Sequence, residues 1–185
     1  MQPQWAAYVA QTCQGDPPHA GMAQLYVEVA PANAVFALVD AAVKHAPVRS
    51  ALQVVERQYG TLELHGRNLA DVKQAGAAIL ERLGATPADA ARPEVIATEV
   101  VTRVDGNQAQ LVNRMRVANL LLEGETMFLL ELAPAAYVAA AANAAEKQSP
   151  IKLVYAAMLG ATGRLIVSGR DAEVAEAKKA ALAAL

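Results

Sequence analysis

The chain contains an internal duplication, and this feature restricts its fold more than any other. When the sequence is shifted by 103 residues, VEVAPANAVFALVDAAVKHAPVR (27–49) aligns with LELAPAAYVAAAANAAEKQSPIK (130–152), and the alignment runs without a gap to residue 67. Of the 41 aligned positions from 27 to 67, 14 are identical, and only five of those are alanines. Such a repeat indicates two copies of one structural unit, so the fold must accommodate that unit twice.

Both copies predict the same elements in the same order. An alternating apolar strand leads to a proline at the first helical turn, and roughly 14 helix-compatible residues then end at Pro47 or Pro150. Two strands joined by a glycine-containing turn follow, within 50–66 and 153–169. A closing helix completes each copy. The sequence therefore predicts an α+β fold with a repeated strand, helix, strand, strand, helix unit.

The closing helices have recognisable ends. Asn68 and Asp171 are the expected N-caps, and Gly84 is the expected end of the first closing helix. The polar, proline-bearing stretch TPADAARPE (86–94) reads as a linker. We therefore divide the chain into domains at 1–88 and 94–185.

A further strand is expected ahead of each copy. Residues 5–16 align weakly with residues 96–107 at a shift of 91, through Ala6/Ala97, Val9/Val100 and Gly15/Gly106. Copy two then carries an additional segment, NQAQLVNRMRVANLLLEGE. This segment is expected to be helical because Leu111, Met115, Ala118 and Leu122 recur at helical intervals.

Composition excludes several classes of function. The net charge of −2 and the lack of a dense Lys/Arg segment argue against nucleic-acid binding. The longest apolar runs, such as 135–142, are far shorter than the ~20 residues of a membrane helix. The single cysteine, Cys13, cannot form an internal disulfide, and the first ten residues lack the features of a secretory signal. We expect a cytoplasmic, globular protein.

The whole pattern resembles the tandem, circularly permuted shell proteins of bacterial microcompartments. The phrase VVERQYG, with QPQWAAYVAQTCQG, KQAGAAILERLG and NAAEKQSPIKL, is similar to the double-domain shell proteins of the carboxysome. The resemblance implies two ferredoxin-like domains per chain and a homotrimer that forms a pseudo-hexagonal tile with a central pore. It also implies partners: hexameric and pentameric shell proteins, and possible stacking of two trimers face to face.

The same resemblance assigns the pore lining. The loop between the two middle strands of each copy would rim the pore, and only the loop of copy one is charged. The assigned residues are Glu56, Arg57, Gln58, Tyr59 and Gly60 in copy one, and Leu159, Gly160, Ala161 and Thr162 in copy two.

If charged and small loops alternate around the pore, Glu56 and Arg57 have room to pair between neighbouring chains. A close pair gains about 4 kcal/mol at an effective dielectric near 20, but an exposed pair nets about 0–1 kcal/mol, so three pairs could close a pore without locking it. We hypothesise that Glu56 and Arg57 gate the pore.

Three basic residues are candidates for the tile edge. Lys44 and Lys147 occupy the same register in both copies and match the edge lysine of the family. The simpler interpretation is that each lysine faces the negative end of its helix dipole. Arg103 lies near a second edge arginine of the family, although the surrounding motif differs.

Other signals do not predict catalysis or a cofactor. GATGR (160–164) resembles a nucleotide-binding glycine loop, but a strand follows it where a helix would be needed. The histidines, His19, His45 and His65, show no metal-site spacing and read as surface or packing residues, and no nucleophile has a base beside it in sequence. Glu28 and Glu131 read as structural hydrogen-bond acceptors. We expect neither enzyme activity, nor a metal, nor a cofactor.

The expected function is a structural shell tile with a gated pore for metabolites such as sugar phosphates, to which Arg57 supplies attraction. One alternative is a trimeric ferredoxin-like regulatory protein that binds a small ligand. Another is a shell protein of a compartment that degrades diols or ethanolamine.

Overall fold

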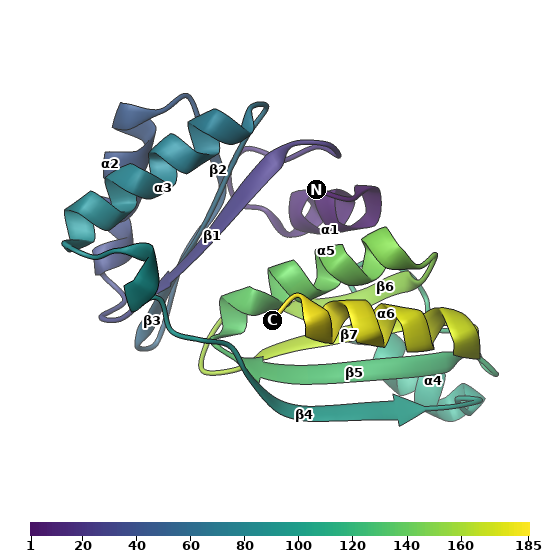
Figure 1. Ribbon diagram of the computed structural model, residues 1–185. Helices are drawn as coiled ribbons and strands as arrows, with labels where there is room; N and C mark the ends of the chain where they lie inside the picture. The colour runs from purple at the N-terminus through teal and green to yellow at the C-terminus, as the bar shows by residue number, and fades with distance from the viewer.

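The computed structural model describes residues 1–185 and contains two antiparallel sheets, each with a pair of helices on one face (Figure 1). The first sheet has the order β1-β3-β2 and the second the order β4-β5-β7-β6. The strands are β1 (Ala23–Val29), β2 (Arg49–Glu56), β3 (Tyr59–Gly66), β4 (Glu94–Val101), β5 (Thr126–Ala133), β6 (Lys152–Ala157) and β7 (Gly163–Gly169). The predicted α+β class and duplicated unit are confirmed.

The paired helices of each unit pack on its sheet because their apolar residues recur every three or four positions. These helices are α2 (Ala34–His45) and α3 (Leu69–Leu83) in the first unit, and α5 (Val138–Gln148) and α6 (Asp171–Ala183) in the second. Helices α2 and α5 begin shortly after Pro31 and Pro134, and the 3₁₀ turn η2 (Ala135–Tyr137) leads into α5. Val35, Leu38, Leu62 and Leu64 are among the buried residues beneath α2 and α3.

The predicted helix ends are largely correct. Gly84 ends α3 in the left-handed region with φ 64°, and Asn68 precedes α3 at the N-cap position. In the second unit the N-cap is Arg170, one residue before the predicted Asp171, which is the first residue of α6.

Gly60 and Gly163 show why the repeat retains glycine at the start of its third strand. A Cβ on Gly60 would lie 2.3 Å from the carbonyl oxygen of Ala32, and one on Gly163 would lie 2.6 Å from the carbonyl oxygen of Ala135. The strand and the turn before the helix thus approach too closely for any side chain. Both copies preserve the same close contact.

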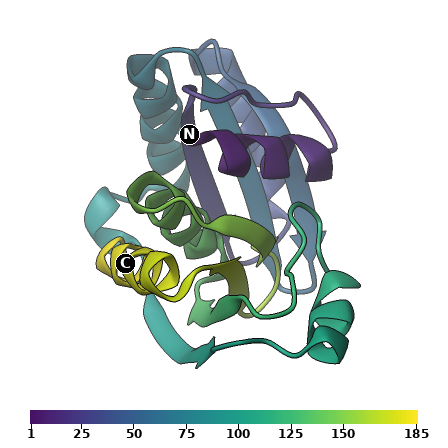
Figure 2. The ribbon, with the colours of Figure 1, turned by 90° about the vertical axis from the view of Figure 1, so that its right-hand side faces the viewer.

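The prediction of a strand within residues 5–16 is wrong. Residues 5–12 lie in helix α1 (Pro3–Thr12) instead. Pro3 is in the first turn of this helix, where a backbone N–H has no partner within the helix and is not needed. Trp5, Tyr8 and Val9 are buried at three- and four-residue spacing, so helical periodicity prevails over the apparent alternation. Helix α1 lies across the first sheet on the face opposite α2 and α3 (Figure 2).

Helix α4 (Gly106–Asn113) is the counterpart of α1, at the same offset of 103 residues as the rest of the repeat. After α1, the Gln14 and Asp16 N–H groups donate to the carbonyl oxygens of Ala51 and Ser50. After α4, Val117 and Asn119 donate in the same way to Val154 and Leu153. Both segments then end in a glycine in the left-handed region, Gly21 with φ 85° and Gly124 with φ 83°.

The segment described as additional in copy two is therefore part of the repeat, and the offset of 91 is a false register. The predicted helix within it ends at Asn113, because the Asn113 side chain hydrogen-bonds both the N–H and the carbonyl of Leu121 and so forms a loop. The element present in only one unit is β4, which pairs with the outer edge of β5. Strand β1 occupies the corresponding edge in the first sheet and pairs only with β3.

The connection between the units includes the 3₁₀ turn η1 (Pro87–Asp89) ahead of β4. Helix α1 crosses between them: Trp5, Tyr8 and Val9 belong to the same buried cluster as Phe128, Val138 and other residues of the second unit. The boundaries 1–88 and 94–185 stay a prediction. None of the helices combines the length and hydrophobicity needed to span a bilayer.

Candidate functional site

The two loops assigned to the pore lie next to each other in space and line a single cavity of about 660 Å³. Seven of the nine assigned residues line it: Glu56, Arg57, Gln58, Tyr59, Leu159, Gly160 and Ala161. The loops meet closely, since a Cβ on Gly160 would lie 3.7 Å from Cγ of Glu56. Residues about 100 positions apart in the sequence thus form one surface.

The other two assigned residues do not line this cavity. Gly60 is buried in β3 against Ala32 and Val35. The Thr162 hydroxyl donates to Oε1 of Glu131 at 3.0 Å. Both residues lie at the base of their loops and hold the loops to their units.

The first loop is a two-residue turn between β2 and β3, and its backbone is unusual. Arg57 has φ 56°, a conformation that glycine adopts easily and that costs other residues about 1–3 kcal/mol. The Arg57 side chain is 92% exposed, and its Nε lies 3.6 Å from Oε1 of Glu56. A pair so exposed contributes about 0–1 kcal/mol, so the guanidinium is free to exchange partners.

The second loop, between β6 and β7, carries no charged side chain from Met158 to Thr162. Gly160 has φ 93°, which permits the sharp bend beside Glu56. Other walls of the cavity come from α1, the segment after it and β6, and include Tyr8, Thr12, Gln14 and Tyr155. Tyr8 is fixed in place because its hydroxyl donates to the Ala156 carbonyl at 2.7 Å and accepts from the Ala156 N–H.

The three candidate edge residues are exposed and lie apart from the cavity lining. Lys44, in the last turn of α2, forms an ion pair with Asp40 at 2.7 Å. Lys147, in the last turn of α5, has Asn143 in place of that aspartate and makes no ion pair. Arg103, between β4 and α4, has φ 49° and shares with Arg57 a left-handed conformation found at no other non-glycine residue.

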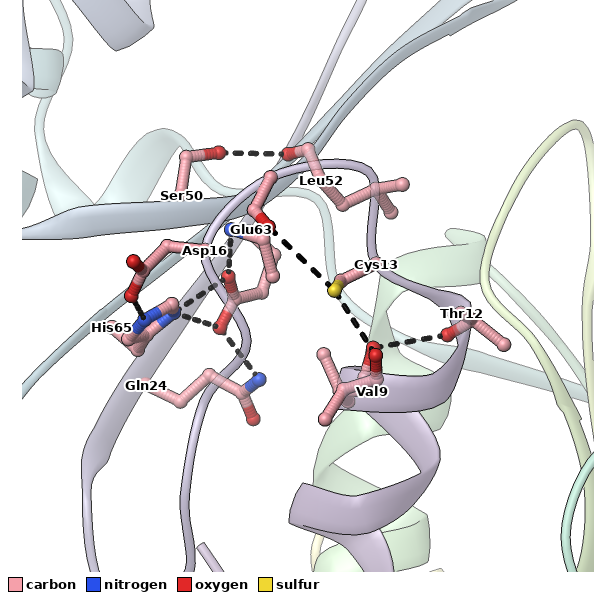
Figure 3. Close-up of polar contacts among 12 residues, drawn as sticks. Val9, Thr12, Cys13, Asp16, Gln24, Ser50, Leu52, Glu63 and His65 are labelled. Atoms are coloured by element: carbon pink, nitrogen blue, oxygen red, sulfur yellow. Dashed lines mark hydrogen bonds and ion pairs between the residues drawn. The ribbon is translucent and has the colours of Figure 1, made fainter.

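Sequence reasoning missed a polar network between β3 and the segment after α1, toward the end of β3 away from the first loop (Figure 3). Glu63 and His65 point from β3 toward the segment after α1, and His65 lies between two carboxylates. Its Nδ1 is 3.1 Å from Glu63 Oε2, and its Nε2 is 3.2 Å from Asp16 Oδ2. Glu63 also accepts from the Ala51 N–H at 2.9 Å and from Gln24 Nε2 at 2.8 Å.

The centre of the network is almost inaccessible to water, whereas the side chain of Asp16 is 52% exposed. His65 is 1% exposed and Glu63 is 0% exposed. Burial lowers the pKa of His65, but the hydrogen bonds and charges of Glu63 and then Asp16 outweigh it, so the pKa of His65 lies above its ordinary value. His65 is therefore a packing residue, one of the two roles predicted for it.

Glu28 and Glu131 occupy equivalent positions and bind different partners. Glu28 of the first unit accepts from the Ala136 N–H of the second unit at 2.8 Å. Burial raises the pKa of Glu28, although hydrogen bonds from Ala136 and Ala135 oppose the rise. Glu131 accepts from Thr162 and lies 3.5 Å from Arg164. The predicted role of both as hydrogen-bond acceptors agrees with these contacts.

Comparison with known proteins identifies the family. Residues 1–89 match the family described as the CsoS1D N-terminal domain. Over its full length the chain is 38% identical to the carboxysome shell protein CcmP of Synechococcus elongatus, covering 87% of that protein. The chain belongs to the tandem-domain shell proteins of bacterial microcompartments. The predicted family, and the prediction of a structural protein rather than an enzyme, are thereby confirmed.

Two further relatives agree with this membership. The carboxysome shell protein CsoS1D of Hydrogenovibrio crunogenus is 40% identical, with all of this chain and 91% of that protein covered. The solved structure of the fused permuted hexameric shell protein MSM0275 from the RMM microcompartment is 43% identical and superposes with a TM-score of 0.97, covering all of this chain and 91% of that one. The whole fold, including α1, is therefore that of a permuted shell protein.

Proposed function

We propose that three copies of this chain form a pseudo-hexagonal shell tile with a central pore, and that Glu56 and Arg57 gate the pore. The observation that carries the proposal is the meeting of the two loops at the cavity of about 660 Å³. Three chains around one axis would alternate three charged loops with three small ones. The exposed Arg57 would then supply the only positive charge among the loop residues of the rim.

The exposed Arg57 side chain suits attraction of phosphate-bearing metabolites. Guanidinium binds phosphate through paired N–H groups, and Arg57 is held only by a 3.6 Å contact with Glu56. A sugar phosphate is therefore the proposed class of passenger. Two of the relatives carry carboxysome in their names and a third comes from an RMM microcompartment. We propose the shell of a carboxysome as the location, with hexameric and pentameric shell proteins as neighbours.

The gate is tested by comparing structures of the wild type, Glu56→Ala and Arg57→Ala. We expect the wild-type trimer to show closed and open arrangements of the first loop, and both variants to show only an unobstructed pore. The same unobstructed pore in all three proteins would contradict gating. Saturable binding of one sugar phosphate per chain, by trimers that form no flat sheets, would favour the regulatory alternative instead.

The edge assignment is tested by Lys44→Glu combined with Lys147→Glu. We expect the double variant to remain a soluble trimer and to lose the flat sheets that the wild type forms under the electron microscope. Glu81→Lys, an exposed charge reversal on α3, is the matched control and should leave sheets intact. Sheets formed by the double variant would place the edge contacts elsewhere.

A further inference from the structure

The segment after α1, residues 13–22, connects α1 to β1 and is held to the first sheet by few contacts. Seven of the eight residues from 14 to 21 are exposed, and Pro18 is the one that is buried. The backbone N–H groups of Gln14, Gly15 and Asp16 donate to β2 at 2.8, 3.0 and 2.9 Å. The only side-chain hydrogen bond from this segment to the sheet joins Asp16 to His65 of β3. Loss of this contact would leave the segment attached only through backbone bonds and the buried Pro18.

The position of His65 allows both of its side-chain contacts in only one protonation state. Its Nδ1 lies 3.1 Å from Oε2 of Glu63, and its Nε2 lies 3.2 Å from Oδ2 of Asp16 (Figure 3). An ionised carboxylate can only accept a hydrogen bond, and a neutral imidazole has a single N–H to donate, whereas the protonated ring has two. Neutral His65 would therefore direct a lone pair at one of the two carboxylates. Because that arrangement is repulsive, one contact must break when His65 loses its proton.

The contact with Asp16 is the one expected to break. The buried Glu63 side chain also accepts from the Ala51 N–H at 2.9 Å and from Gln24 Nε2 at 2.8 Å, so it is fixed in place. The Asp16 carboxylate is half exposed and accepts from His65 alone. Water can therefore replace His65 as the partner of Asp16, but it cannot reach Glu63. Neutral His65 thus keeps its proton on Nδ1 and its bond to Glu63.

Few other charges face His65. Arg49 of β2 lies opposite His65 in the sheet and opposes its protonation, but Arg49 is exposed, so solvent and salt screen its charge. Tyr26 of β1 lies opposite Glu63 and stays neutral, because burial raises its pKa well above the ordinary value. Helix α1 carries no charged residue. The two carboxylates therefore dominate the surroundings of the ring, which agrees with the raised pKa of His65.

We propose that protonation of His65 controls the attachment of the segment after α1: protonated His65 binds Asp16 and holds the segment on the sheet, and neutral His65 releases Asp16. The segment borders two cavities. Gln14 lines the cavity of about 660 Å³ between the two loops, and Asp16 lines a second cavity of about 700 Å³ together with Arg49. Release of the segment would therefore change the shape of both cavities as the pH rises. The switch is a property of one chain and does not depend on the trimer of the proposed function.

Amide hydrogen exchange of the wild-type protein tests the switch, because the second unit provides an internal control. The counterpart of the segment is residues 116–125, where Val117 and Asn119 donate to β6 in the same way and Ser168 stands in place of His65. Protection factors correct for the intrinsic effect of pH on exchange. From about pH 6 to about pH 9, a range that spans the titration of histidine, we expect those of the Gly15 and Asp16 amides to fall on the order of tenfold, as loss of a hydrogen bond between charged groups implies. Those of residues 116–125 should stay constant.

Asp16→Asn is the matched variant. Its amide can present the carbonyl oxygen to the protonated ring or the NH₂ group to the lone pair of the neutral ring, so the attachment should no longer depend on pH. Glu81→Gln, the same change of carboxylate to amide at an exposed position on α3, is the control and should keep the wild-type pH dependence. NMR of ¹³C-labelled histidine follows the protonation of His65 in each protein. Loss of one carboxylate in Asp16→Asn should lower the pKa of His65.

Four results would contradict the switch. Protection of Gly15 and Asp16 that stays constant while His65 titrates would show that the segment does not respond to the charge of the ring. An equal loss of protection in residues 116–125 would mean that the whole chain opens instead. A His65 that stays protonated over the whole range would leave the segment permanently attached. These three results come from the wild type, so they apply even if a variant misfolds. The fourth is wild-type pH dependence in Asp16→Asn, which would mean that Asp16 is not the partner released.

Discussion

The outer faces of the two sheets, opposite their paired helices, differ sharply although their backbones are repeats of one another. The first carries the charged network of Gln24, Glu63 and His65. At the offset of 103 residues the second carries Met127, Ile166 and Ser168, and its Met127 and Ile166 join a buried apolar cluster with α4. The same backbone thus accommodates a polar face in one unit and a largely apolar face in the other. The loops show the same contrast, because only the first unit is charged at the cavity.

This difference gives the first unit polar contacts that the second unit lacks. Glu63 and Asp16 tie β3 and the segment after α1 to each other through His65. That segment also binds β2, which leads directly to the Glu56–Arg57 turn. The network therefore joins β3 to the segment after α1 at the end of the β2–β3 pair away from the Arg57 turn.

Removal of Glu63 should have the largest effect on stability. Glu63→Ala leaves His65, Gln24 and the Ala51 N–H without their acceptor in a buried site, and breaking a buried charge pair costs about 3–5 kcal/mol. Urea unfolding measures the loss, and Glu63→Gln, which preserves shape and a carbonyl acceptor, is the control with a smaller loss. A cost below about 1 kcal/mol for Glu63→Ala would show that the network is not structural.

Exchanging Gln24, Glu63 and His65 for the residues of the second unit should cost less than that single change. The triple variant Gln24→Met, Glu63→Ile, His65→Ser replaces three polar side chains with the two apolar residues and the serine that the same backbone carries in the second unit. Replacement of a buried ion pair by apolar groups is often neutral or stabilising. Urea unfolding compares the free energy of unfolding of the triple variant with that of Glu63→Ala. A triple variant less stable than Glu63→Ala would mean that the two faces are not interchangeable.

The network should also make stability depend on pH. Because the folded pKa of His65 is raised above its ordinary value of about 6.5, its stabilisation is complete below that value and is lost as pH rises through the folded pKa. A pKa difference of one unit between the folded and unfolded protein is equivalent to about 1.4 kcal/mol of folding free energy. The wild-type Tm should fall over this range, and His65→Gln should flatten the fall. Equal pH profiles for both proteins would remove His65 as the cause.

The smallest effect is expected at the turn between β2 and β3. Arg57→Gly should stabilise the chain by up to about 1 kcal/mol, since glycine adopts φ 56° without strain. Arg57→Ala removes the same charge and retains Cβ, so it should give no gain. Thermal unfolding of the pair separates backbone strain from charge. Equal stabilities would mean that the turn stores no strain.

The sequence was sufficient to predict those features that the repeat expresses locally. Pro47 and Pro150 mark helix ends, and Gly60 and Gly163 mark the same tight contact in each copy, so five elements of each unit were predictable. Residues 5–12 were not, because WAAYVAQT fits both alternation and helical spacing. The register that decides between them depends on backbone hydrogen bonds, such as that from Asp16 to Ser50.

The candidate site was predictable in part for a similar reason. The charged loop stood out because it interrupts a strand pair, and resemblance to a family supplied its role. The buried network left no such signal: Glu63 and His65 look like the solvent face of a strand, and Asp16 lies 49 residues from His65. Only the folded chain brings these residues together.

The most direct test of the account is a cryo-EM or crystal structure of the purified chain in its natural assembly. The account predicts a ring of three chains with Arg57 and Gly160 of every chain at the central opening and Lys44 and Lys147 at the perimeter. A stable monomer, or a trimer in which Arg57 lies at the outer perimeter, would contradict it.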